Sequence, residues 1–220
     1  MASPAIPPIV YGAVWAQLLP ALALLARRNR SRAVVLIASA VLLGFATDWI
    51  GRYVGHRSGN SLWFSNASGV PITVMILMGL ADWQVTQVER LAFRLAVVPY
   101  GLVFAALFFW AEDMGNFSRY SYPFSTLVVL GAAIWTLLRR ALLPAGIPLL
   151  RADWFLVALG LALNAATTTL ASPVAAVLLA NHRVDLIVQV WSVRAIFVII
   201  ALCCIAAGAF RPPSEIPAAA

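Results

Sequence analysis

Seven apolar stretches, each close to the length of a bilayer-spanning helix, constrain this chain more than any other feature. A helix needs about 20 apolar residues to cross the hydrocarbon core. The 220-residue sequence is 63% hydrophobic and 10% charged, and a soluble fold of this size could not bury that much apolar surface. The predicted membrane helices are residues 9–26, 33–54, 62–82, 91–110, 123–138, 154–179 and 186–210.

This pattern predicts an all-α fold, a polytopic seven-transmembrane-helix bundle that forms a single domain over residues 1–220. The last residues, 211–220, contain three prolines and are expected to form a short disordered tail. The composition excludes a soluble enzyme, a disordered chain and a disulfide scaffold.

The distribution of arginine predicts the orientation of the bundle. All 15 basic residues are Arg; ten fall in connections on one side of the predicted helices and four on the other. Short cytoplasmic loops retain positive charge. We therefore expect the N-terminus outside and the C-terminus in the cytoplasm of a bacterial-type cytoplasmic (inner) membrane. Topology explains the net charge of +7, so the expected partner is the lipid bilayer and not nucleic acid.

Two ionisable residues lie deep inside the predicted spans, Asp48 and Arg194. At a rise of 1.5 Å per residue, they lie roughly 10 Å and 12 Å below the outer surface. An intramembrane charge is unfavourable unless it is paired, so one hypothesis places the two side chains opposite each other, directly or through water or a ligand. The alternative is an i,i+4 pair between Asp48 and Arg52 on one helix.

Polar residues inside the spans gather in the outer half or near the middle, whereas the inner halves are almost purely Leu, Val, Ile and Ala. This asymmetry predicts an outward-facing polar pocket above a dry cytoplasmic half. The alternative is that Ser, Thr and Asn join helices by hydrogen bonds. The candidate pocket residues are Asp48, Arg194, Asn66, Ser68, Gln17, Asn164, Thr168, Gln189 and Ser192.

Asp48 is followed along the chain by the run Gly59-Asn60-Ser61-Leu62-Trp63 and by a polar opening of the last stretch, from Gln189 to Arg194. In this order the features resemble an uncharacterised bacterial family of seven-transmembrane-helix proteins, although Val70 and Pro71 stand where the resemblance implies an acidic residue. It implies a seven-helix fold and no established activity. The topology is also similar to that of microbial rhodopsins, whose retinal is held by a Schiff-base lysine. The chain contains no Lys, so covalent retinal is excluded and no cofactor is expected.

Three functions are consistent with these features. The preferred one is a receptor-like or sensory membrane protein that binds a small molecule in the pocket and acts through a membrane or cytoplasmic protein partner, or as an oligomer. The second is a small transporter with a 3+1+3 parallel repeat, because Arg27-Arg28 and Arg139-Arg140 close equivalent helices 112 residues apart. The third is an intramembrane enzyme. No catalytic motif or metal-ligand spacing is present in the sequence, so no catalytic activity and no metal site is expected.

Overall fold

The computed structural model describes residues 7–26, 30–58, 62–112, 118–142 and 148–213. Within these ranges every regular element is a helix, which confirms the predicted all-α fold for this part of the chain. Most of the expected tail (residues 214–220) and the start of the Gly59-to-Trp63 run (residues 59–61) lie outside the described residues.

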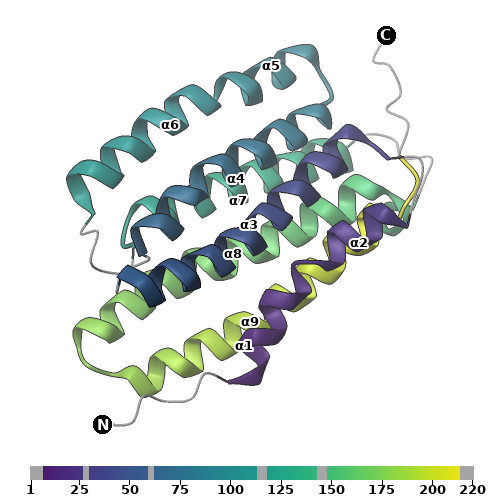
Figure 1. Ribbon diagram of the computed structural model, residues 1–220. Helices are drawn as coiled ribbons and strands as arrows, with labels where there is room; N and C mark the ends of the chain where they lie inside the picture. Colours follow the sequence, from purple (N-terminus) through teal and green to yellow (C-terminus); the bar gives the residue numbers. More distant parts are fainter. Residues whose placement is uncertain (1–6, 27–29, 59–61, 113–117, 143–147, 214–220) are drawn as a thin grey trace.

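The helices group into seven rods that occupy the seven apolar stretches (Figure 1). In chain order the rods are α1 (Pro8–Ala16) with α2 (Leu19–Leu25), α3 (Arg32–Ser58), α4 (Leu62–Asp82), α5 (Gln87–Leu95) with α6 (Val97–Ala106) and the π-helical turn η1 (Leu107–Ala111), α7 (Ser121–Ala141), α8 (Asp153–Ala180) and α9 (Val184–Ala209). A short 3₁₀ turn, η2 (Leu149–Arg151), precedes α8.

Six of these rods are long and apolar enough to cross a membrane, and the apolar part of α4, Asn66–Asp82, is shorter. The structure therefore supports a multi-pass membrane protein. The first rod begins at one end of the bundle and the last rod ends at the opposite end, so the two termini lie far apart (Figure 1). We call the end near the C-terminus the Arg-rich end, because it carries Arg30, Arg32, Arg90, Arg94, Arg139, Arg140, Arg151 and Arg211.

Six rods form a closed ring and the fourth lies outside it. The main contacts run from α1–α2 to α3, α4, α7, α8 and α9, and α9 closes the ring on α1 and α2. The main contacts of the fourth rod in the described part of the chain are with α4 and α7, and Figure 1 shows α5 and α6 on one flank of the bundle. Leaving one rod out makes α7 a parallel neighbour of α4, and it leaves the interior of the ring to the other six.

Two rods are interrupted. The first breaks at Gln17 and Leu18, where the last turn of α1 tightens through bonds from these backbone N–H groups to Val14 and Trp15. Pro20, the second residue of α2, has no N–H to continue the ladder. The fourth rod is divided at Ala96, between α5 and α6, where the backbone stays helical. The sequence predicted a continuous helix in both places.

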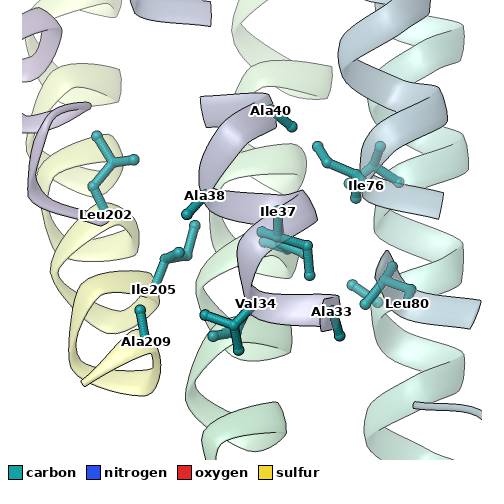
Figure 2. Packing of buried hydrophobic residues seen from close by; sticks show 14 of the residues in the cluster. Ala33, Val34, Ile37, Ala38, Ala40, Ile76, Leu80, Leu202, Ile205 and Ala209 are labelled. Atoms are coloured by element: carbon teal, nitrogen blue, oxygen red, sulfur yellow. The ribbon is translucent and has the colours of Figure 1, made fainter. Parts of the chain in front are cut away.

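A dry layer crosses the ring between its middle and the Arg-rich end. It consists of Val34, Ile37, Leu80, Val157 and Ile205, none more than 4% exposed, and Figure 2 shows the contributions of α3, α4 and α9. Such close packing of apolar side chains excludes water from this part of the ring.

Glycines bring the helices of this layer together. A Cβ on Gly79 would lie 2.8 Å from Ile37, and one on Gly208 would lie 2.6 Å from Val157. Small residues that allow close backbone approach are typical of helix contacts in membranes. The predicted dry half is therefore present, as a glycine-packed layer.

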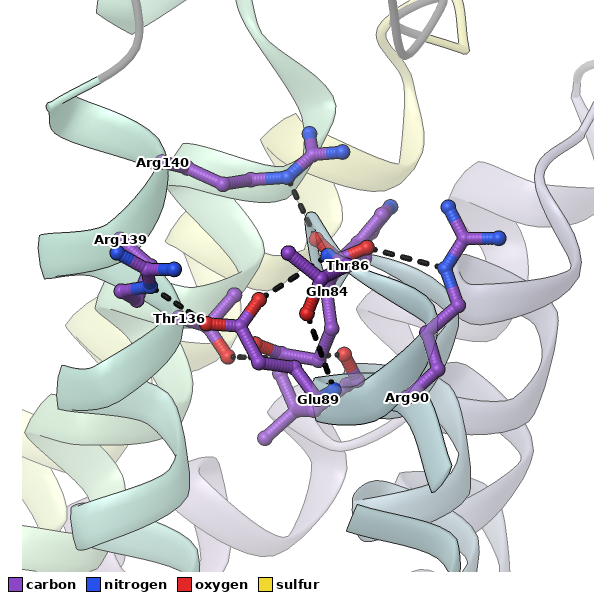
Figure 3. A network of polar contacts seen from close by, with 9 residues as sticks. Gln84, Thr86, Glu89, Arg90, Thr136, Arg139 and Arg140 are labelled. Atoms are coloured by element: carbon purple, nitrogen blue, oxygen red, sulfur yellow. Dashed lines mark hydrogen bonds and ion pairs between the residues drawn. The ribbon is translucent and has the colours of Figure 1, made fainter. Parts of the chain in front are cut away.

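The Arg-rich end itself contains a buried polar cluster that the sequence analysis did not predict (Figure 3). Gln84 is 1% exposed, and its amide donates to the Leu80 carbonyl and to Thr136 Oγ1 on α7, each at 2.9 Å. Arg140 is 6% exposed, donates from Nε to the Trp83 carbonyl at 2.7 Å, and stacks over Trp154. Gln84 and Arg140 lie just beyond the predicted spans 62–82 and 123–138, so of these polar residues only Thr136 interrupts the expected apolar half.

The same cluster holds the turn between α4 and α5. Thr86 and Glu89 form a capping box at the start of α5, a reciprocal arrangement that satisfies two free N–H groups. Arg139 reaches Glu89 Oε1 at 2.6 Å, and Arg90 donates to the Gln84 carbonyl at 3.0 Å. Several arginines that the sequence explained by topology alone thus also stabilise the fold.

Candidate functional site

A cavity of about 470 Å³ lies inside the ring, between the dry layer and the end of the bundle opposite the Arg-rich end. Residues of α1, α3, α4, α7, α8 and α9 line it, and none of its lining residues comes from the fourth rod. This volume is within the range of small-molecule sites, about 300–1,000 Å³. The ring arrangement therefore creates the cavity, because six rods surround a space that none of them fills.

Three charged residues line the cavity: Asp48 and Arg52 from α3, and Arg194 from α9. Among the described residues no ion pair within 4 Å joins any two of them. The charges of both guanidinium groups nevertheless act on the Asp48 carboxylate. Neither direct pairing that the sequence analysis considered is therefore formed, and all three charges face one space.

Gln17 positions the Asp48 carboxylate. Its side-chain amide donates to Asp48 Oδ2 at 2.8 Å. A Cβ added to Gly44 would lie only 3.3 Å from Gln17 Oε1. Gly44 thus leaves room for the amide to reach α3. Because Gln17 lies at the break in the first rod, the backbone irregularity is located at the wall of the cavity, where irregular membrane backbone is tolerated.

Thr168 and Trp191 position Arg194. Both Nε and Nη2 of Arg194 donate to Thr168 Oγ1, at 3.2 Å and 3.1 Å, and the guanidinium carbon lies 4.8 Å from the centre of the Trp191 ring. Thr168 is 2% exposed and does not line the cavity. Thr168 therefore acts behind the cavity wall, where it holds the arginine in place.

Arg52 is held by aromatic rings. Its guanidinium carbon lies 5.1 Å from the centre of the Tyr11 ring and 5.5 Å from that of Trp49. Such cation–π contacts contribute about 0.5–2 kcal/mol and leave the N–H groups at the guanidinium edge available for an acceptor.

Two amides complete the polar lining. Asn66 on α4 is 8% exposed. Asn164 on α8 lies deeper, and its Oδ1 is buried without a hydrogen-bond partner among the described residues. A buried carbonyl oxygen without a donor costs about 1–3 kcal/mol, so a rotation of this side chain that turned Oδ1 toward the cavity that Asn164 lines would let a molecule there satisfy it.

The structure thus brings together six of the nine candidate pocket residues. Lining the cavity are Gln17, Asp48, Asn66, Ser68, Asn164 and Arg194. Thr168 lies behind the wall. Gln189 and Ser192 are placed elsewhere: Gln189 is exposed, and the Ser192 hydroxyl donates to the Val188 carbonyl at 2.7 Å. The reason is helical spacing, because the α9 lining residues recur every three or four positions and 189 and 192 fall on other faces.

Other polar residues of the spans join helices, as the alternative interpretation supposed. Thr126 on α7 bonds Thr169 on α8 at 2.7 Å, and Ser125 bonds Tyr100 on α6 at 2.9 Å. Both interpretations therefore apply, each to a different subset of the polar residues.

Several lining residues were not predicted from the sequence, among them Tyr122 and Arg52. Tyr122, at the start of α7, lines the cavity, and the charges of Arg194 and Asp48 both act on it. The available signal was its position beside Pro123 at the start of an apolar stretch, which resembles an ordinary interfacial tyrosine.

Glu112 holds the segment that leads into α7 and includes the lining residue Ser118. Its carboxylate accepts hydrogen bonds from the Ser118 hydroxyl at 2.6 Å and from the backbone N–H groups of Arg119, Tyr120 and Ser121 at 3.1, 2.8 and 2.6 Å. Burial raises the pKa of this carboxyl, but the four hydrogen bonds outweigh burial and hold its pKa below the ordinary 4.5. Glu112 thus caps the start of α7, which carries Tyr122.

Comparisons with known proteins found no family model, curated protein or solved structure that matches the chain. The resemblance to an uncharacterised bacterial seven-helix family therefore stays a prediction. Function has to be argued from the cavity and its side chains.

Proposed function

We propose that this protein is a receptor-like membrane protein that binds a small polar molecule in the cavity of the ring. The observation that carries the proposal is the meeting of Asp48, Arg52 and Arg194 in one space of about 470 Å³ without direct ion pairs among them. Unpaired charges inside a membrane bundle are unfavourable and are a sign of a functional site. A ligand that pairs with them would offset this cost.

The proposal includes an orientation with the Arg-rich end in the cytoplasm, as the distribution of arginine favours. All seven rods then cross the membrane and the cavity opens outward. The dry layer separates the cavity from the cytoplasm, so signalling requires a small relative movement of helices that a membrane or cytoplasmic partner, or a second copy, detects.

Cysteine accessibility tests the orientation and the opening. In a Cys203→Ala, Cys204→Ala background, we expect a membrane-impermeant thiol reagent added from outside to modify Ser68→Cys, which lines the cavity. Val34→Cys in the dry layer and Leu42→Cys, exposed outside the cavity, are the controls and should not react. Reaction of Ser68→Cys only from the cytoplasmic side would contradict the proposed orientation.

Ligand-dependent stability tests binding itself. The purified protein in nanodiscs is heated with a panel of amino acids, carboxylates, amines and sugars, since a ligand of the folded state raises the unfolding temperature. We expect at least one class to stabilise the wild type and not Arg194→Ala. The control Arg183→Ala removes an exposed arginine that pairs with Asp185 outside the cavity, and it should respond as the wild type does. No stabilisation by any class would contradict the proposal.

A transporter is the second candidate, and the order of the ring favours it. If α1–α2, α3 and α4 are exchanged with α7, α8 and α9, every contact of the ring maps onto another observed contact. The fourth rod then acts as the linker that a parallel 3+1+3 repeat requires. Uptake of the identified ligand into proteoliposomes, abolished in Arg194→Ala, would establish transport over sensing.

A further inference from the structure

We infer that the cavity selects a small zwitterion with an apolar body, such as an α-amino acid with an apolar side chain. This inference rests on the proposed function, because it names the ligand class of the same cavity. It is carried by the signs of the lining charges, by the hydrogen-bonding atoms that those charges leave available, and by the apolar character of the deeper wall.

The signs of the charges suit a ligand with both signs. A single carboxylate, Asp48, and two guanidinium groups, Arg52 and Arg194, line the cavity. A simple anion would balance the net charge of these three groups but would offer no donor to the carboxylate. A simple amine would pair with Asp48 and add positive charge beside two arginines. A zwitterion provides a partner for each sign, and attraction between opposite charges is stronger in a partly desolvated cavity than in bulk water.

The hydrogen-bonding atoms agree with the charges. Asp48 accepts the Gln17 amide through Oδ2, and no described residue donates to its Oδ1. Arg194 uses Nε and Nη2 on Thr168, which leaves Nη1. Arg52 contacts aromatic faces, and none of the described side chains or carbonyls accepts from it. An ammonium group suits the free carboxylate oxygen, and a carboxylate suits the arginine donors.

The deeper wall is suited to an apolar body. Ile76, Leu161 and Leu202 line the cavity next to the dry layer. Arg194 and Leu202 are eight positions apart on α9, so the charged level and the apolar level are separated by about 12 Å along the helix. Asn164 lines the cavity between these levels and adds one neutral polar side chain to the wall.

The test compares skeleton-matched probes. Binding to the wild-type protein in nanodiscs is measured by calorimetry for L-leucine, L-methionine and L-phenylalanine, for the same three skeletons without the amino group, and for the three without the carboxyl group. We expect the amino acids to bind about tenfold or more tightly than either set of analogues, since a hydrogen bond to a charged group is typically worth that factor.

The Asp48→Asn variant makes the inference falsifiable independently of folding. Asparagine retains an acceptor for Gln17 but not the negative charge, so the preference for an amino acid over its deaminated acid should fall from about tenfold to about one. An unchanged preference would overturn the inference. Arg194→Gln should weaken binding of both the amino acids and the deaminated acids. The control, Arg183→Ala, should leave all affinities unchanged.

The remaining outcomes separate this inference from the proposed function. If the wild type binds deaminated acids as tightly as amino acids, and Arg194→Gln abolishes both, the ligand is an anion and the zwitterion inference is wrong while the cavity still binds a small molecule. If sugars alone stabilise the protein, the inference is likewise wrong. If no class stabilises it, both the inference and the proposed function are wrong.

Discussion

Gly160 on α8 lies so close to α9 that a Cβ at this position would be 2.5 Å from the Ala201 carbonyl oxygen and 2.7 Å from Ile205 Cγ1. The first of these atoms is backbone, which cannot move away as a flexible side chain can. The contact fixes the spacing of the two helices at the floor of the cavity, where the deepest lining residues of α8 and α9 are the neighbouring Leu161 and Leu202.

We therefore expect Gly160→Ala to destabilise the protein by about 1–3 kcal/mol, the range for an overpacked core, when thermal unfolding is measured in nanodiscs. Gly131→Ala on α7 is the matched control, because nothing lies within 4 Å of its added Cβ. That variant should be unchanged or more stable by about 0.5–1 kcal/mol, since Ala is the better helix former. Equal stability of the two variants would contradict the packing.

Thr136→Val tests the buried bond between Gln84, in the turn after α4, and α7. Valine has the shape of threonine but accepts no hydrogen bond, so the Gln84 amide would retain only the Leu80 carbonyl as a partner. We expect a loss of about 1–2 kcal/mol of unfolding free energy. The control is Thr167→Val, whose hydroxyl bonds only carbonyls of its own helix; it should change stability by less than about 0.5 kcal/mol. A loss in the control as large as that in Thr136→Val would contradict the assignment.

Arg140→Lys tests whether this arginine stabilises the fold in addition to supplying positive charge at the Arg-rich end. Lysine keeps the charge but has no planar guanidinium to stack on Trp154 or Nε to bond the Trp83 carbonyl. Because Arg and Lys differ at stacked, buried sites, we expect a lower unfolding temperature and a loss of about 2 kcal/mol. Arg139→Lys, at a partly exposed pair with Glu89, should lose no more than about 1 kcal/mol. Equal effects would mean that Arg140 contributes charge alone.

Acid should weaken the cap that Glu112 places on α7. The folded-state pKa of this carboxyl lies below its ordinary 4.5, so the unfolded state binds more protons in this range and stability rises with pH. The stabilisation is complete above about pH 4.5 and is lost as the pH falls through the folded pKa. Glu112→Gln should lose about 1 kcal/mol at neutral pH and unfold with a flatter dependence on pH below 4.5.

The control for this prediction is Asp185→Asn, which removes an exposed carboxylate held only by a 3.5 Å pair with Arg183. It should keep the acid dependence of the wild type. If Glu112→Gln retained that full dependence, a different carboxylate would be responsible for it.

The sequence predicted the helices well because their length and apolar character are local properties. The stretch 62–82 coincides with α4, Leu62–Asp82, and 33–54 lies within α3. It did not predict the break at Gln17. The tightened turn and Pro20 could both be accommodated in a bent, continuous helix, and the break is seen only in the structure, beside the Asp48 side chain to which Gln17 donates.

The candidate site was predicted in part. Asp48 and Arg194 were identified because a charge within an apolar run is visible in the sequence. The face that each helix turns toward the cavity was not identified, because these helices are apolar all round and carry no periodic signal. For the same reason Gln189 and Ser192 could not be separated from Arg194, although α9 directs them elsewhere.

The sequence by itself determined that this chain forms a bundle of apolar helices and which few charges lie within them, because both follow from composition along short segments. Only the tertiary structure decided that the fourth rod lies outside the ring and that Asp48, Arg52 and Arg194 share one cavity. It also decided that Gln84 meets Thr136 across two helices. Those relationships depend on the rotation and order of helices, which are set by contacts between residues far apart in the chain, such as Gly160 with Ala201.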